Sequence, residues 1–257
     1  MRYLVLVFSL LLVSGGINAR TAVDSLHTRS SFKAGQLIAP AVLGGSGLAV
    51  HFLGHESIEL PLRNYIWHDL RREGTVKAVN IDDYLRFVPV TAYLGLGLVG
   101  VKSQHAFVDR SLEAAIAYFL SMGSGFVAKK IFSTVRPDAS GNDSFPSGHA
   151  IIAFTGAGLV GMDYGWGWGA GAYGFSALVS ASRIYADKHW LGDILAGAGL
   201  GILCAYAAGW LLEPVKDLLG IPTIDWDGLG TGQTQLTFAP CIDPLSGSYT
   251  ASMSLVF

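Results

Sequence analysis

The sequence predicts an all-α protein, a helical membrane bundle of about five or six spans with a short C-terminal β-hairpin-like tail. Three observations lead to this fold class. Of the 257 residues, 51% are hydrophobic and only 14% are charged, whereas ordinary soluble domains carry roughly 25% charged residues. The mean hydropathy is +0.44, and apolar runs recur along the chain. Such a chain has little polar surface to present to water, so a lipid bilayer is its expected partner.

Charge and length narrow the function classes further. The formal net charge is -2, and no basic tract suggests a nucleic acid as a partner. A chain of this length suits one domain with a sizeable core. Cys204 and Cys241 match no zinc spacing and are assigned to no site. Composition leaves the oligomeric state open.

The chain begins like an exported protein. A positively charged start precedes an apolar stretch at residues 3–13, and small residues follow up to Ala19. This order is typical of a secretory signal, and an uncleaved N-terminal anchor is the alternative. We therefore divide the chain into a signal peptide or anchor at 1–19, a helical domain at 20–212 and a C-terminal tail at 213–257.

The mostly apolar stretches of the middle region are expected to form helices. A glycine-broken aromatic segment at residues 163–168 is expected to be a turn between two of them. The stretch at 150–162 is short for a bilayer unless its helix begins inside the preceding Pro-Ser-Gly turn. The expected helices cover residues 37–53, 87–101, 112–127, 150–162, 173–181 and 191–212.

Two further segments differ from these helices. Within residues 56–86, Pro61 suits the first turn of a helix, and the pattern predicts an amphipathic interfacial helix. This helix is either a solvated surface element or a cap on the active site. Residues 235–238 and 249–257 alternate between apolar and polar side chains, which predicts a β-hairpin. One hairpin cannot close a membrane barrel of at least about eight strands, so we expect the tail to pack against the helices.

Three polar clusters interrupt the apolar sequence, and the first joins Lys129 with Arg136 and Pro137. The two cations share a face if their helix continues to residue 135. Pro137 disfavours helix at Arg136 and turns the chain. Two cations at the end of an apolar helix need an anion or contact with water, and contact with water is the simpler explanation for this pair alone.

The second cluster is Pro146-Ser147-Gly148-His149, at the expected start of a helix. Ser147 is a good N-cap residue, and the free N–H groups of a first helical turn bind anions. Gly148 lets the backbone approach a phosphate closely. Taken alone, this cluster fits a capped helix with an unrelated histidine equally well.

The third cluster contains Ser182, Arg183, His189 and Asp193. His189 and Asp193 share a helical face, so the carboxylate can accept one imidazole proton while the other nitrogen keeps an outward lone pair. In a continuous helix Arg183 would face away from them. We therefore expect a break at residues 186–188 that turns Arg183 inward. A lone His–Asp pair is more often a structural hydrogen bond, but three clusters together favour a phosphoryl-transfer site.

Together the clusters resemble the three signature motifs of the type 2 phosphatidic acid phosphatase superfamily. Every signature position is filled in the right order, and the combined pattern is highly specific. The exported start and the apolar spans are similar to those of its bacterial membrane lipid phosphatases. The motifs read Lys129-x6-Arg136-Pro137, Pro146-Ser147-Gly148-His149 and Ser182-Arg183-x5-His189-x3-Asp193.

The resemblance implies a role for each signature residue. His189 attacks phosphorus and becomes phosphohistidine, Asp193 orients it, and His149 protonates the leaving oxygen and then helps to activate water. A bell-shaped pH profile is expected, because attack needs neutral His189 and departure needs protonated His149. No metal and no other cofactor is implied. The residues that would bind the phosphoryl oxygens are Lys129, Arg136, Ser147, Gly148 and Arg183.

The implied reaction is hydrolysis of a lipid phosphate or diphosphate monoester in a bacterial membrane, and the sequence does not fix the head group. A soluble periplasmic non-specific acid phosphatase of the same superfamily is an alternative that the apolar spans disfavour. A vanadium haloperoxidase shares the motifs but usually has a much longer chain. A non-catalytic lipid-binding protein is disfavoured by the intact catalytic set. Export favours the inner membrane with a periplasm-facing site, and the periplasm or the outer membrane is the alternative location. Counting residues 37–53 as a span would instead place the site in the cytoplasm.

Overall fold

The computed structural model describes residues 32–70, 81–221, 235–242 and 249–256. The predicted signal peptide or anchor lies outside these residues. The described chain belongs to two compact units, a helical one and a C-terminal one. Each is described by itself.

The helical unit consists of long apolar helices joined by short connections, with a group of short helices after the first long one. Its elements are η1 (Ala34–Leu37), α2 (Ile38–Leu53), η2 (His55–Glu59), α3 (Leu60–Tyr65), η3 (Ile66–Leu70), α4 (Asp82–Leu85), α5 (Val88–Leu98), α6 (Phe107–Phe132), α7 (Gly148–Tyr164), α8 (Trp166–Tyr185) and α9 (Leu191–Leu219).

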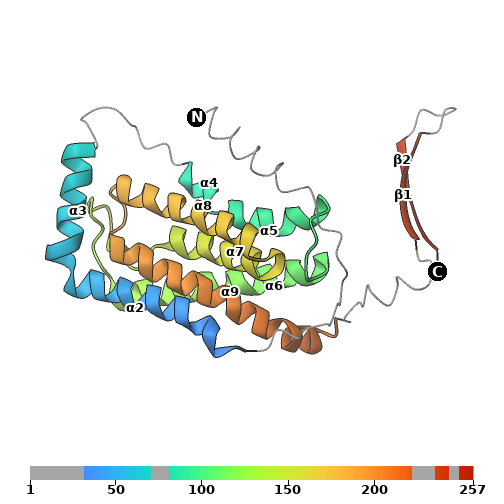
Figure 1. Cartoon of the computed structure of the whole chain (residues 1–257), viewed down its shortest axis with the longest axis horizontal. Helices are drawn as coiled ribbons and strands as arrows, with labels where there is room; N and C mark the ends of the chain where they lie inside the picture. The colour runs from blue at the N-terminus through green and yellow to red at the C-terminus, as the bar shows by residue number, and fades with distance from the viewer. Residues whose placement is uncertain (1–31, 71–80, 222–234, 243–248, 257) are drawn as a thin grey trace. The chain divides into compact units, whose positions relative to one another are not determined.

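Helix α9 lies at the centre of this bundle. It packs against α2, α6 and α7, and α7 in turn packs against α5 and α8. Figure 1 shows α2 running beside α9, and α3 lying across one end of the bundle at an angle to the long helices. Small side chains such as Ala205 and Ala208 of α9 are fully buried beside Leu159 of α7 and Tyr93 of α5. The small residues allow close packing of these helices in the core of the bundle.

Glycines bring α2 and α9 into backbone contact. A Cβ atom on Gly47 would lie 2.3 Å from the backbone nitrogen of Ala196, and one on Gly192 would lie 2.7 Å from the carbonyl oxygen of Gly47. Any side chain at these positions would force the helices apart. The contact places the C-terminal turns of α2 beside the first turn of α9.

Among the described residues, three helices have the length and the apolar composition that a membrane span requires. They are Ala34–Leu53, Phe107–Phe132 and Leu191–Leu219. The apolar side chains of Phe119, Met122 and Phe126 on α6 are exposed, as expected for a surface that faces lipid. Helix α5 is apolar but only 11 residues long, and a span needs about 20 residues. The predicted total of about five or six spans stays a prediction.

Several helices extend beyond the boundaries expected from the sequence. The segment at residues 163–168 is largely helical, because Gly165 alone, with φ 83°, reverses the chain between α7 and α8. Glycine reaches positive φ without strain. Helix α9 continues past residue 212 to Leu219, where Lys216 bonds Glu213 at 3.2 Å and Asp109 of α6 at 3.1 Å. These ion pairs provide partners for the charged residues at this end of the helix. The apolar pattern of the sequence does not reveal them.

The C-terminal unit contains two antiparallel strands, β1 (Gln235–Ile242) and β2 (Tyr249–Val256). Gln235 pairs with Val256, and Ile242 pairs with Tyr249. Packing of this tail against the helices stays a prediction.

Candidate active site

The predicted site residues gather at one end of the bundle. Antiparallel helices bring together the last turn of α6, the start of α7, the end of α8 and the start of α9. The loop between α6 and α7 is held by Thr134, whose carbonyl accepts the N–H of Ser144 at 3.0 Å and whose hydroxyl accepts the N–H of Phe145 at 2.9 Å. The signature clusters therefore sit on anchored backbone.

The expected break before His189 is confirmed. Helix α8 ends at Tyr185, and Asp187 in the following turn has a φ of 60° before α9 begins. Because of this turn, the buried side chains of Arg183 and His189 lie at the same end of the bundle.

Asp193 is the most heavily bonded side chain of the site. Its Oδ2 accepts the Ser144 hydroxyl at 2.5 Å and the backbone N–H of Trp190 at 2.8 Å, and lies 3.4 Å from Nδ1 of His189. Its backbone carbonyl accepts the N–H of Ser147 at 3.0 Å. Asp193 thus links the second and third signature clusters while its carboxylate faces the predicted nucleophile.

The surroundings of His189 favour a neutral imidazole. Burial lowers its pKa, Asp193 opposes this shift through its bond and charge, and the charges of Lys129 and Arg136 lower the pKa further. A neutral imidazole whose Nδ1 faces a carboxylate keeps its lone pair on Nε2. This is the form that nucleophilic attack requires.

The start of α7 has the features of an anion site. Ser147 is the N-cap, as predicted, and its hydroxyl accepts the N–H of Ala150 at 3.5 Å. A Cβ atom on Gly148 would meet no described atom within 4 Å. The backbone of this turn is therefore open to a ligand at Gly148.

The cations of the first cluster are held by Asp143. Arg136 donates to both of its carboxylate oxygens at 2.8 and 3.0 Å, and Lys129 donates to its backbone carbonyl. The bond from Arg136 lowers the pKa of the Asp143 carboxyl. Two cations are thus placed beside His189, whose pKa both of them lower.

The remaining two site residues are paired with acids of α4. His149 Nε2 lies 2.8 Å from Oδ1 of Asp83, and the buried Arg183 donates to Asp82. Burial, followed by the charge of Arg183, lowers the pKa of His149 to about 4, although the bond to Asp83 raises it. With no phosphate bound, His149 is therefore neutral near pH 7.

The site consequently has two halves. His189 and Asp193 are grouped with Lys129 and Arg136, while His149 is grouped with Arg183. Ser182 takes no part in either half, because its hydroxyl donates to the carbonyl of Val179 within α8 at 2.6 Å.

Sequence reasoning missed the partners Asp82, Asp83, Asp143 and Ser144. Ser144 and Asp143 could have been suspected from their place just before the second signature motif.

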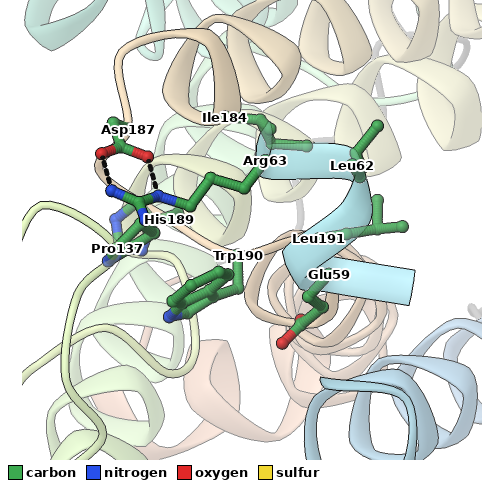
Figure 2. Close-up of a pocket in the computed structure, with 9 residues that line it drawn as sticks. All are labelled: Glu59, Leu62, Arg63, Pro137, Ile184, Asp187, His189, Trp190 and Leu191. Carbon is green, nitrogen blue, oxygen red and sulfur yellow. Dashed lines mark hydrogen bonds and ion pairs between the residues drawn. The ribbon is translucent and has the colours of Figure 1, made fainter. Parts of the chain in front are cut away.

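A small pocket opens beside His189 and is crossed by an ion pair (Figure 2). Arg63 of α3 donates two bonds of 2.7 Å to Asp187, in the turn that precedes His189. Its guanidinium also lies 5.9 Å from the ring centroid of Trp190. Helix α3 is therefore tied to the turn that precedes His189. The lining residues are Glu59, Leu62, Arg63, Pro137, Ile184, Asp187, His189, Trp190 and Leu191.

Comparison with known proteins agrees with the signature motifs. Residues 110–215 match the model of the family described as the PAP2 superfamily, which is the type 2 phosphatidic acid phosphatase superfamily. The matched region contains all of the signature residues.

Two relatives are named as lipid A phosphatases. The chain is 32% identical over 138 residues to a lipid A 1-phosphatase of Porphyromonas gingivalis, covering 52% of this chain and 31% of that protein. It is 28% identical to a lipid A 4'-phosphatase of Helicobacter pylori, covering 65% of this chain and 86% of that protein. The crystal structure of Aquifex aeolicus LpxE is similar with a TM-score of 0.43 and 23% identity, covering 59% of this chain and 94% of that one.

Proposed function

We propose that this chain is a membrane phosphatase that hydrolyses a lipid phosphate or diphosphate monoester through a phosphohistidine at His189. The observation that carries the proposal is the placement of buried His189 between Asp193 and the cations Lys129 and Arg136. This arrangement offers a neutral nucleophile beside fixed positive charge, which phosphoryl transfer requires.

In the first half-reaction, the Nε2 lone pair of His189 forms a bond to phosphorus while the bond from phosphorus to the leaving oxygen breaks. Asp193 accepts a hydrogen bond from the Nδ1–H, which stays on the ring, and stabilises the positive charge that develops there. Lys129, Arg136 and Arg183 balance the charge on the phosphoryl oxygens, together with the backbone at Gly148. His149 gives a proton to the leaving oxygen.

In the second half-reaction, His149 is neutral and takes a proton from water. That water forms a bond to phosphorus, and the bond from phosphorus to His189 breaks. The products are inorganic phosphate and the free enzyme. Fixed side-chain cations supply the positive charge in this scheme, so the proposal includes activity without an added metal ion.

Lipid A is the first substrate to test, because two relatives are named as lipid A phosphatases. The exposed apolar surface of α6 and the three candidate spans fit a substrate that lies in the membrane. We place the protein in the bacterial inner membrane with the site facing the periplasm, since the N-terminal sequence is typical of export.

The experiment is phosphate release by the full chain in detergent with EDTA, over a panel of lipid A, undecaprenyl diphosphate, phosphatidate and phosphatidylglycerophosphate. His189→Ala is compared with His68→Ala, which alters an exposed histidine of η3. Release that is lost only in His189→Ala supports the proposal. Full release by His189→Ala, or release that requires a metal ion, contradicts it.

Three added measurements separate the alternatives: membrane fractionation without detergent, release from p-nitrophenyl phosphate, and binding to lipid A vesicles. A soluble acid phosphatase would leave the membrane fraction without detergent and would prefer p-nitrophenyl phosphate to every lipid. A lipid-binding protein would bind lipid A vesicles and release no phosphate.

A further inference from the structure

The two oxygens of the Asp193 carboxylate have different surroundings. Oδ2 accepts the Ser144 hydroxyl and the Trp190 N–H and faces His189. Oδ1 is buried and, among the described residues, receives no bond of good hydrogen-bond geometry. Burying a charged oxygen without a donor costs free energy. The second oxygen of this carboxylate therefore needs a partner.

His51 of α2 is positioned to be that partner. Its Nδ1 lies 3.3 Å from Oδ1 of Asp193. This nitrogen is likewise buried without a bond of good geometry to any described residue. Two unsatisfied polar atoms that face each other at this distance need only a small rotation of the imidazole to form a hydrogen bond. His51 lies outside the three signature motifs.

The packing of α2 against α9 creates this proximity. A Cβ atom on Gly192 would lie 2.7 Å from Cβ of His51, so glycine next to Asp193 is what admits the imidazole. The rings of Phe52 and Phe145 lie with their centroids 4.8 Å from that of His51. The imidazole is therefore confined on its apolar sides, and its polar atom is left to face the carboxylate.

A second carboxylate, that of Glu59, approaches the same nitrogen of His51 from a greater distance. Oε2 of Glu59 is 3.8 Å from Nδ1 of His51 and 2.8 Å from Nδ1 of His55. The other oxygen of Glu59 accepts the N–H of Gly192 at 2.8 Å, in the first turn of α9. The charge of Lys129 on α6 also acts on Asp193. A buried cluster of α2 and η2 residues thus borders the catalytic carboxylate.

We propose that His51 is a positioning residue for phosphoryl transfer, which holds Oδ1 of Asp193 through Nδ1 so that Oδ2 stays directed at His189. The inference rests on the proposed function. His51 itself touches neither the phosphate nor the leaving group in this scheme. It acts on the orientation of Asp193, and through Asp193 on the charge that His189 can carry.

Two substitutions separate hydrogen bonding from packing. His51→Asn places an amide N–H close to the position of Nδ1 but removes most of the ring. His51→Phe keeps an aromatic ring between Phe52 and Phe145 but offers no donor. His55→Phe is the matched control, because His55 bonds Glu59 and its side chain is 42% exposed.

We expect His51→Phe to lower kcat by roughly 10- to 100-fold, the range for losing a hydrogen bond to a charged group, with KM within about twofold. His51→Asn and His55→Phe should keep kcat within about threefold. Near-normal kcat in His51→Phe, or a greater loss in His51→Asn than in His51→Phe, would overturn the proposal, because packing alone would then explain the residue. Thermal unfolding of each variant in detergent confirms that the folded protein is compared.

A second readout does not depend on turnover. Asp193, Lys129 and Arg136 act on His189 through their charges, and Glu59, Arg63 and Asp187 line the same pocket. The contact with Asp193 favours the protonated form of His189. If Asp193 turns away in His51→Phe, His189 should titrate at lower pH than in the wild type. Histidine NMR in detergent, assigned with His189→Ala, measures this directly. An unchanged titration of His189 contradicts the proposal.

The two readouts keep this inference separate from the proposed function. Wild-type protein that releases no phosphate from any lipid would count against the function, while the NMR titration would still decide the coupling from His51 to His189. If the wild type is active and His51→Phe keeps its kcat and its His189 titration, the inference about His51 is wrong and the proposed function stands.

Discussion

Oδ1 of Asp83 lies 2.8 Å from Nε2 of His149, so a carboxylate of α4 is paired with the histidine that the scheme assigns as proton donor to the leaving oxygen. The neighbouring Asp82 is bonded in the same way to Arg183. In the other half of the site, Arg136 is bonded to Asp143. With no phosphate bound, carboxylates therefore balance the charge of the groups that an anionic substrate would contact.

The first prediction concerns Asp83. Asp83→Asn should strengthen inhibition by inorganic phosphate and vanadate by about threefold to tenfold, because the Asp83 side chain is 46% exposed and two like charges about 4 Å apart in water repel by roughly 1 kcal/mol. The inhibition constants of the variant and the wild type are compared at one pH. Glu56→Gln, which alters an exposed acid of η2, should leave them unchanged. Weaker inhibition of Asp83→Asn would show that Asp83 assists anion binding.

The second prediction concerns pH. Burial and Arg183 hold the pKa of His149 at about 4 in the free site, whereas a bound phosphoryl dianion favours the imidazolium and raises it. The pH profile of kcat reports the enzyme–substrate complex, and that of kcat/KM reports the free enzyme. The alkaline limb of the kcat profile should therefore lie at higher pH than that of the kcat/KM profile.

Asp83→Asn supplies the internal control for this pH dependence. The bond from Asp83 raises the pKa of His149, so its weakening should move the alkaline limb of kcat/KM to lower pH. Ionisation of the substrate is the same for both proteins and cancels in the comparison. Limbs of kcat and kcat/KM that coincide in the wild type, or do not move in the variant, argue against His149 as the proton donor.

The third prediction concerns Ser144. Its hydroxyl donates to Oδ2 of buried Asp193 at 2.5 Å, and a hydrogen bond to a charged group contributes roughly 1.5 to 3 kcal/mol. Ser144→Ala should therefore lower kcat by about 10-fold or more. Ser111→Ala removes a hydroxyl that donates within α6 to the carbonyl of Phe107, and it should retain full activity. Equal activities of the two variants would exclude Ser144 from the positioning of Asp193.

The fourth prediction concerns stability. Gly192→Ala adds a Cβ atom 2.7 Å from the carbonyl oxygen of Gly47, so overpacking should lower the free energy of unfolding by about 1 to 3 kcal/mol. Gly123→Ala in α6 meets no described atom within 4 Å and should be neutral or stabilising by up to about 1 kcal/mol. Thermal unfolding in detergent compares them. A higher unfolding temperature for Gly192→Ala than for Gly123→Ala would contradict the close contact of α2 with α9.

Local features of the site could be predicted from the sequence. The N-cap at Ser147 and the break after α8 follow from side-chain chemistry and helix periodicity within a few residues. The shared face of His189 and Asp193 follows from their spacing alone. These predictions succeed because short-range sterics and hydrogen bonding decide them.

Contacts between distant segments could not be predicted in the same way. Asp83 meets His149 across 66 positions, and Asp82 meets Arg183 across 101. His51 reaches Asp193 because small residues let α2 and α9 approach. Such contacts depend on which helices pack together, and the apolar pattern of a membrane helix leaves its neighbours open.

The central claim is the covalent intermediate at His189, and direct trapping tests it. The full chain in detergent is mixed with lipid A labelled with ³²P, or with whichever lipid of the panel it hydrolyses fastest, and the reaction is stopped with alkali within milliseconds to seconds. We predict label on the protein that is stable in base, lost in acid, mapped to the peptide carrying His189, and absent from His189→Ala. Rapid phosphate release with no label on the protein at any quench time, or label that persists in His189→Ala, would contradict the mechanism.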